Sequence, residues 1–153
     1  MEIVDILTPA RIAIDVGVAS KKAVLEELAR LGATEAFGFT PAQAFDSLVS
    51  RERLGSTGLG NGIAIPHGRV AHLEVMVGAL LRTNNPIDFD AIDGAPADLF
   101  FALFVPDQTT EEHLAMLAKL AEVFSDQPLV DKLRSSDSTK SIHDLLGLPS
   151  ENR

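Results

Sequence analysis

A glycine-rich segment between residues 55 and 68 places the tightest limit on how this chain can fold. Its sequence, GSTGLGNGIAIPHG, contains five of the protein's 11 glycines. Glycine loses more backbone freedom on ordering than any other residue, so such a run cannot sustain a helix. We expect a looped ribbon with positive φ at some glycines and with backbone amides that face a ligand. The alternative is a bulged hairpin that needs positive φ only for its own geometry.

The segment ends in a short apolar stretch followed by a histidine between a proline and a glycine. Residues 63–65 have strand character, and Pro66 fixes its own φ while biasing the preceding residue toward extended geometry. We expect Gly68 to let the chain turn away at once. His67 would then stand on a constrained turn at the rim of a sheet, beside backbone N–H donors.

Composition narrows the classes of function. The chain has 153 residues, 46% of them apolar and 23% charged, which predicts one domain over residues 1–153 with a frayed end at 149–153. A net charge of −9 and the absence of Trp and Tyr argue against nucleic-acid binding. The absence of Cys excludes disulfides and thiolate chemistry. No signal peptide or long apolar run is evident, so we expect a cytoplasmic protein without membrane insertion.

Strand and helix patterns alternate along the chain. Strand patterns cover residues 12–16, 63–65, 75–81, 87–89 and 98–105, with turns expected at 84–86 and 93–94. The run at 98–105 is too hydrophobic for a half-exposed strand and is expected at the centre of the sheet. These patterns predict an α/β fold, a single three-layer domain with a mixed β-sheet of about five strands flanked by helices.

Capping signals place the helices. Ser20 is expected to cap the first, and Thr40 with Pro41 and Gln43 forms a capping box for the second, which ends near Arg51. Thr109 with Glu112 predicts a second capping box, and two further helices are expected near residues 128 and 138. The buried stripe expected for the Thr109 helix is Leu114, Leu117, Leu120, Ala121 and Phe124.

Three side chains are candidates for a functional site. His67 lies in the glycine-rich segment, Arg51 precedes it, and His113 falls in the first turn of a helix, whose positive end favours an anion. Each also has an ordinary interpretation: a structural histidine, a solvated charge, and a half-buried histidine bonded to a carbonyl. His72 and His143 have no supporting context and are expected at the surface.

Several common motifs are absent. The segment lacks the Gly-Lys-Ser/Thr ending of a P-loop and the third glycine of the dinucleotide fingerprint. There is no His-Glu-x-x-His metal motif and no Gly-x-Ser-x-Gly hydrolase motif. We therefore expect neither a cofactor nor a metal.

The chain resembles the IIA components of the bacterial phosphotransferase system, in the fructose/mannitol-type family and most closely its nitrogen-regulatory branch (IIA-Ntr). The resemblance covers almost the whole chain. The residues that carry it are Arg51-Glu52, 55–58, 60–68, 86–93, 101–103 and 105–106.

This resemblance implies that His67 accepts a phosphoryl group on Nε2 from a small histidine-phosphorylated carrier of the HPr type. It also places an arginine and a second histidine beside the acceptor, at Arg51 and His113. It implies a phosphoryl carrier rather than an enzyme that turns over a small molecule. Regulated target proteins are implied as partners, such as regulators of potassium transport or of sensor kinases.

Two other functions stay open from the sequence. One is a soluble IIA subunit that passes phosphate to the IIB domain of a fructose/mannitol-type permease. The other is a binding module that holds a free anion in the glycine-rich segment without covalent chemistry.

Overall fold

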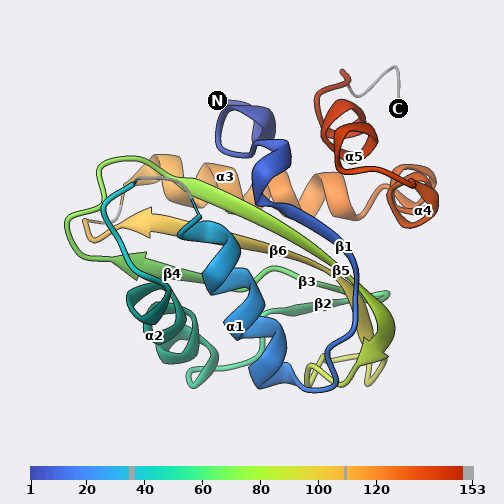
Figure 1. Cartoon of the computed structure of the whole chain (residues 1–153), viewed down its shortest axis with the longest axis horizontal. Coiled ribbons are helices and arrows are strands. Elements are labelled where there is room, and N and C mark those ends of the chain that lie inside the picture. The colour runs from blue at the N-terminus through green and yellow to red at the C-terminus, as the bar shows by residue number, and fades with distance from the viewer. Residues whose placement is uncertain (35–36, 109, 150–153) are drawn as a thin grey trace.

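A mixed β-sheet separates two layers of helices in the computed structural model of the chain (Figure 1). The structure describes residues 1–34, 37–108 and 110–149. Its strands are β1 (Ile12–Val16), β2 (Gly58–Gly60), β3 (Ile63–Ala64), β4 (His67–Val70), β5 (Val77–Ile87) and β6 (Ala97–Pro106). Its helices are α1 (Lys21–Gly32), α2 (Pro41–Glu52), α3 (Glu111–Phe124), α4 (Gln127–Ser135) and α5 (Thr139–Leu146), with short 3₁₀ turns η1 (Ile3–Asp5) and η2 (Pro9–Arg11). The predicted three-layer α/β fold with a mixed sheet is confirmed, with six strands in the described residues.

The hydrophobic strand β6 lies at the centre of the sheet, as its composition predicts. The strand order is β1-β5-β6-β3-β2, and β4 also pairs with β6. β5 runs antiparallel to β6, whereas β3 and β4 run parallel to it. Eight of the ten residues of β6 are buried, which matches a strand covered by helices on both faces.

Each face of the sheet has its own hydrophobic core. Helices α1 and α2 cover one face, packing on side chains such as Ala79 and Phe104. Helices α3, α4 and α5 cover the other, packing on Leu80 and Phe101. None of the helices in residues 1–34, 37–108 and 110–149 is long and apolar enough to span a membrane.

The capping box at the start of α2 is confirmed. The side chain of Thr40 accepts a hydrogen bond from the amide of Gln43, and the side chain of Gln43 accepts one from the amide of Thr40. Ser20 also caps α1 as expected, by accepting from the amide of Ala23. These local signals hold because both partners of each bond lie within one turn of chain.

The predicted start of α3 is wrong by one residue. Thr109 lies outside the described residues, and the N-cap is Thr110, whose capping-box partner is His113 rather than Glu112. The predicted buried stripe is also partly wrong, because Leu114 is 63% exposed while Met116 and Val123 are buried. The frayed end predicted from residue 149 lies outside the described residues from 150 onward.

The turn predicted at residues 84–86 is also wrong. β5 runs without a break from Val77 to Ile87, and the predicted strand at 87–89 is partly its last residue. The pairing with β6 changes register between Arg82 and Ile87, so the Asn-Asn-Pro sequence forms an irregular stretch inside one strand. Pairing on either side of this stretch, with β1 up to Thr83 and with β6 at Ile87, therefore overrides the local turn preference.

Strands β3 and β4 pair one after the other with the same edge of β6, in a single register. Ile63 lies opposite Leu99 and His67 lies opposite Leu103, so the register is kept across Ile65 and Pro66. The amide of Leu103 donates to the carbonyl of Pro66 at 2.9 Å, which holds this interruption against β6. His67 is thus fixed at the first position of a paired strand.

Candidate functional site

An open pocket of about 780 Å³ lies where α2, the beginning of β4 and the first turns of α3 meet. The structure brings the three site residues predicted from the sequence into its lining, which includes Arg51, His67, Arg69, Asp46, His113, Leu54, Leu114 and Leu117. Residues more than 40 positions apart in the chain therefore contribute to one site.

The position of His67 follows from β4 rather than from a turn. Alternate strand residues face opposite sides of a sheet, and Gly68 and Val70 face the α2 layer. A Cβ on Gly68 would lie 2.5 Å from the backbone oxygen of Ser47 in α2. Gly68 is needed for this close approach, so our expectation that it turns the chain away is wrong.

The ring of His67 is held by one hydrogen bond to the backbone. Its Nδ1 lies 2.9 Å from the carbonyl oxygen of Ile65, two residues earlier. A carbonyl only accepts, so Nδ1 carries the proton in the neutral ring and Nε2 keeps its lone pair. The side chain is partly buried and lines the pocket, which leaves Nε2 as the nucleophilic atom.

The surroundings of His67 favour the neutral ring. Burial is the main cause that lowers its pKa below the ordinary value of 6.5, and the positive charge of Arg51 lowers it further. The bond to the Ile65 carbonyl and the negative charge of Glu52 act in the opposite direction. The net effect is a ring that is uncharged at neutral pH and able to act as a nucleophile.

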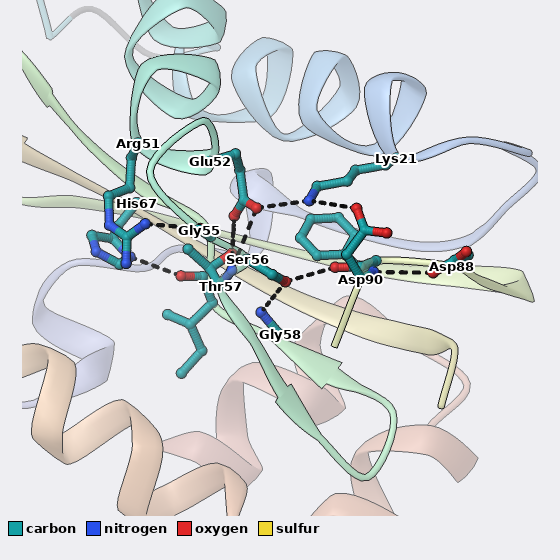
Figure 2. Close-up of polar contacts among 12 residues, drawn as sticks. Lys21, Arg51, Glu52, Gly55, Ser56, Thr57, Gly58, His67, Asp88 and Asp90 are labelled. Atoms are coloured by element: carbon teal, nitrogen blue, oxygen red, sulfur yellow. Dashed lines mark hydrogen bonds and ion pairs between the residues drawn. The ribbon is translucent and has the colours of Figure 1, made fainter. Parts of the chain in front are cut away.

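Arg51 lies beside the imidazole, near the end of α2 (Figure 2). Its Nη1 donates to the carbonyl oxygen of Gly55 at 2.9 Å, which orients the guanidinium. A guanidinium has five N–H donors in one plane. In the described part of the chain this is the one hydrogen bond that the Arg51 side chain makes, so further guanidinium donors remain for an anion at the pocket.

The hydrogen bond of His113 runs in the opposite direction to that of His67. Its Nδ1 accepts from the amide of Thr110 at 3.3 Å as part of the α3 capping box. The proton of the neutral ring must therefore lie on Nε2, which becomes a donor. Only 6% of His113 is exposed, and it lines the pocket at the positive end of a helix, where an anion is favoured by roughly 0.3–1 kcal/mol.

The glycine-rich segment forms a hairpin, which was the alternative left open from its sequence. β2 and β3 pair antiparallel through Asn61 and Gly62, which both have positive φ, at 57° and 82°. Two-residue hairpins of the primed type require this, and Asn-Gly is their commonest sequence. The tip is held from both sides, since the Asn61 amide donates to Asp93 and the Asn61 carbonyl accepts from Arg134.

Several amides of this segment already have partners within the protein. Those of Thr57, Gly58 and Asn61 donate to the side chains of Glu52, Ser56 and Asp93. The expected bed of ligand-facing amides is therefore wrong at these three positions. Ser56 also donates to the carbonyl oxygen of Phe89 at 2.6 Å, so the segment serves as a braced support for His67 (Figure 2).

Sequence reasoning missed the role of Glu52 as a bonding centre behind the pocket. Its carboxylate accepts from both the amide and the hydroxyl of Thr57 and pairs with Lys21 at 2.9 Å (Figure 2). The signals in the sequence were its place next to Arg51 and its part in the family resemblance, and neither indicates what it bonds to. The partners lie 5 and 31 positions away and could not be identified from spacing.

Two exposed leucines, Leu54 and Leu114, line the pocket and are called its apolar rim below. Leu54 is 83% exposed and Leu114 is 63% exposed, and both line it. Large apolar side chains on a protein surface gain stability when a partner covers them. The site thus combines a polar centre with an apolar rim.

The other two histidines lie away from this pocket. His72 is exposed, as expected, whereas His143 is partly buried and its Nε2 lies 2.8 Å from the carbonyl oxygen of Leu7. Among the residues that the structure describes, no group of three or more His, Cys, Asp or Glu is placed to hold a metal ion.

Comparison with known proteins identifies one family. The model of the family "Phosphoenolpyruvate-dependent sugar phosphotransferase system, EIIA 2" matches residues 5–147. The chain is 45% identical over 141 residues to a nitrogen regulatory protein of Pseudomonas aeruginosa, covering 92% of each chain. It is 41% identical over 149 residues to one from Bradyrhizobium diazoefficiens, covering 97% of each. A crystal structure of nitrogen regulatory protein IIA-Ntr from Neisseria meningitidis superposes with a TM-score of 0.88 at 43% identity, covering 94% of this chain and 98% of that one.

Proposed function

This chain belongs to the EIIA 2 family of the phosphoenolpyruvate-dependent sugar phosphotransferase system, and within that family we propose that it is a regulatory phosphoryl carrier. His67 accepts a phosphoryl group from an HPr-like histidine phosphocarrier. Target proteins then bind the phosphorylated and unphosphorylated forms with different affinities. The relatives named nitrogen regulatory protein support the regulatory part of this proposal.

The observation that carries the proposal is the hydrogen bond of the His67 ring. With Nδ1 donating to the Ile65 carbonyl, Nε2 has a lone pair at the pocket. A neutral imidazole nitrogen attacks phosphorus readily, and a covalent intermediate divides a difficult transfer into two easier steps. The lowered pKa of His67 keeps the ring in this form at neutral pH.

The transfer is balanced in charge and atoms. Nε2 of His67 forms a bond to phosphorus as the P–N bond in the donor's phosphohistidine breaks, and the electron pair of that bond returns to the donor ring. The proton on Nδ1 of His67 stays there and keeps its hydrogen bond to the Ile65 carbonyl. The positive charge therefore moves from the imidazole ring of the donor to that of His67. Phosphoryl transfer depends mainly on positioning and electrostatic stabilisation, and no metal is needed in this scheme.

Two side chains are placed to stabilise the phosphoryl oxygens. Arg51 offers guanidinium donors from α2, and His113 offers its Nε2–H from the first turn of α3. Donors that are already oriented before the reaction stabilise developing charge without reorganising. Both side chains are oriented by hydrogen bonds to backbone groups, which supports this role.

The apolar rim supports a protein as the donor. A free phosphate compound would contact the polar centre alone, whereas a protein surface would also cover Leu54 and Leu114. Covering one leucine contributes about 1.5–3 kcal/mol. We therefore propose that the donor docks over these leucines with its phosphohistidine directed at His67.

A mass measurement tests the acceptor. The protein is incubated with a phosphorylated HPr-type carrier, and its intact mass is recorded under mildly alkaline conditions that preserve phosphohistidine. We expect one added phosphoryl group in the wild type and in His72→Asn, and none in His67→Ala. Labelling of His67→Ala would refute the assignment, and no labelling of any form would favour a module that binds a free anion.

The second candidate function is a soluble IIA subunit of a sugar permease, which the sugar phosphotransferase description of the family favours. In that case the group passes from His67 to a IIB domain. Phosphorylated protein is mixed with an isolated IIB domain of the fructose/mannitol type, and its rate of phosphoryl loss is compared with that in buffer alone. Rapid transfer would favour the transport function over the regulatory one.

A further inference from the structure

We propose that Glu52 is a positioning residue for His67, acting through Thr57 and the carbonyl of Ile65, with Lys21 as its counter-ion. The inference rests on the proposed role of His67 as a phosphoryl acceptor. It concerns a carboxylate that lies behind the pocket rather than in its lining.

Glu52 holds Thr57 through both the amide and the hydroxyl of that residue. Its Oε1 accepts from the Thr57 amide at 3.2 Å and from the Thr57 hydroxyl. Only 6% of the Glu52 side chain is exposed, and Thr57 is buried as well. Hydrogen bonds to a charged, buried acceptor are stronger than those between neutral groups, so the position of Thr57 is well defined.

Two further hydrogen bonds connect Thr57 to the imidazole. The amide of Ile65 donates to the carbonyl oxygen of Thr57 at 3.0 Å. The carbonyl oxygen of Ile65 then accepts from Nδ1 of His67 at 2.9 Å. The carbonyl that selects the reactive tautomer of His67 therefore belongs to a residue whose own amide is held in place by Thr57 and hence by Glu52.

Lys21 balances the charge of Glu52. Its Nζ lies 2.9 Å from Oε2 of Glu52 and 4.7 Å from the centre of the Phe89 ring (Figure 2). A buried carboxylate is costly without an opposite charge, and Lys21 at the first position of α1 supplies it. A second carboxylate, Asp90, lies 3.4 Å from Lys21 but is largely exposed, and in the described part of the chain it contacts Lys21 and Asp88 rather than Thr57.

The charge of Glu52 has a use beyond holding Thr57. Attack by Nε2 turns the His67 ring into a cation, and a nearby carboxylate stabilises that cation, as the buried Asp does for the His of a serine protease triad. Burial and Arg51 lower the pKa of His67, and Glu52 opposes them. The other charged or titratable groups around the pocket are Asp46, Arg69 and His113.

The test is an NMR titration of the His67 ring nitrogens, which needs no phosphoryl donor. Glu52→Gln keeps an oxygen for Thr57 but removes the charge, so the pKa of His67 should fall below its wild-type value. Asp90→Asn is the matched control, because it removes the other carboxylate at Lys21, and it should leave the pKa unchanged. An unchanged pKa in a folded Glu52→Gln would overturn the inference.

A second variant covers the case in which Glu52→Gln does not fold. Thr57→Val removes the hydroxyl that donates to Glu52 while keeping the shape of the side chain. We expect the Nδ1–H tautomer of His67 to lose its predominance, as read from the ¹⁵N shifts of the ring. Wild-type tautomer populations in Thr57→Val would overturn the inference.

Transfer rates link the inference to function. Both variants should accept the phosphoryl group roughly 10- to 100-fold more slowly, the cost typical of a slightly misplaced reacting group. Wild-type rates in both variants would contradict a positioning role. If the wild type itself accepts no phosphoryl group, the proposed function fails, while the titration still decides whether Glu52 positions His67.

Discussion

The Nδ1 atoms of His67 and His113 make opposite hydrogen bonds at one pocket. In His67 this nitrogen donates to the Ile65 carbonyl at 2.9 Å, and in His113 it accepts from the Thr110 amide at 3.3 Å. The two neutral rings therefore carry their protons on different nitrogens. In the proposed transfer, Nε2 of His67 would accept phosphorus and Nε2 of His113 would donate to the phosphoryl oxygens.

This relationship makes a prediction for His113. Both His113→Gln and His113→Glu should preserve the capping box of α3, since Gln and Glu are the usual partners at this helical position. Gln retains N–H donors, whereas Glu has none and repels the phosphoryl group. We expect Glu to slow transfer about 100-fold relative to Gln. Rapid mixing with phosphorylated carrier, followed by quenching, measures both transfer rates. Equal rates would show that His113 does not donate a hydrogen bond to the phosphoryl group.

Arg51 predicts a pH dependence. Its positive charge helps to keep the pKa of His67 below the ordinary value, after the larger effect of burial. Transfer needs the neutral ring, so its rate should fall only when the pH drops below that lowered pKa. Arg51→Ala should raise the pKa and shift the acid limb of the profile to higher pH. Arg53→Ala, at an exposed position two residues later, is the control; an unshifted limb in Arg51→Ala would contradict the model.

Gly68 links the stability of the fold to the site. A methyl group there would meet the backbone of Ser47, so Gly68→Ala should push α2 away from β4. We expect a loss of about 1–3 kcal/mol in the free energy of unfolding by urea, together with slower transfer because Arg51 moves with α2. Gly17→Ala is the control, since its nearest neighbouring atom is at 3.8 Å. Equal stability of the two variants would disprove the close approach.

The apolar rim predicts a dependence on the type of donor. Leu54→Ser combined with Leu114→Ser should raise the KM for a phosphorylated protein carrier about tenfold or more, because contact area is lost. The rate with phosphoramidate, a small phosphoryl donor, should be unchanged. Ile92→Ser removes an exposed apolar side chain outside the pocket lining and serves as the control. If transfer from both donors were impaired equally, the leucines would be maintaining the shape of the pocket rather than contacting the protein carrier.

The sequence predicted those parts of the fold that depend on neighbouring residues. The cap of α1, the capping box of α2 and the central position of β6 follow from local spacing and from one long apolar run. The continuous β5 did not, because the pairing that flanks its Asn-Asn-Pro stretch, with β1 up to Thr83 and with β6 at Ile87, cannot be identified from local sequence. Local preference is overridden by pairing in such cases.

The buried face of α3 was ambiguous for a different reason. Apolar residues cover two adjacent stripes of this helix, one with Met116 and Val123 in the core and one with Leu114 and Leu117 at the pocket. Helical periodicity measures amphipathic character, but it does not separate a core from a surface that a partner covers. The assignment of Leu114 to the core is therefore wrong, whereas Leu117 does pack against the core.

For the site, the sequence and its family resemblance led to His67, Arg51 and His113, which line one pocket. The residues that hold these three side chains in place could not be predicted from the sequence. Gly68 is expected from the sequence to turn the chain away after His67, whereas it lies within β4 and permits α2 to pack against that strand. Glu52 and Lys21 are joined by an ion pair across 31 positions, and only the folded chain brings them together.

The most direct measurement is the position of phosphorus on the phosphorylated protein. Long-range ¹H–¹⁵N and ¹⁵N–³¹P NMR of ¹⁵N-labelled protein assigns the modified nitrogen within the ring. The account predicts phosphorus on Nε2 of His67, with the proton still on Nδ1 and bonded to Ile65. Phosphorus on Nδ1 of His67, or on any other histidine, would contradict it.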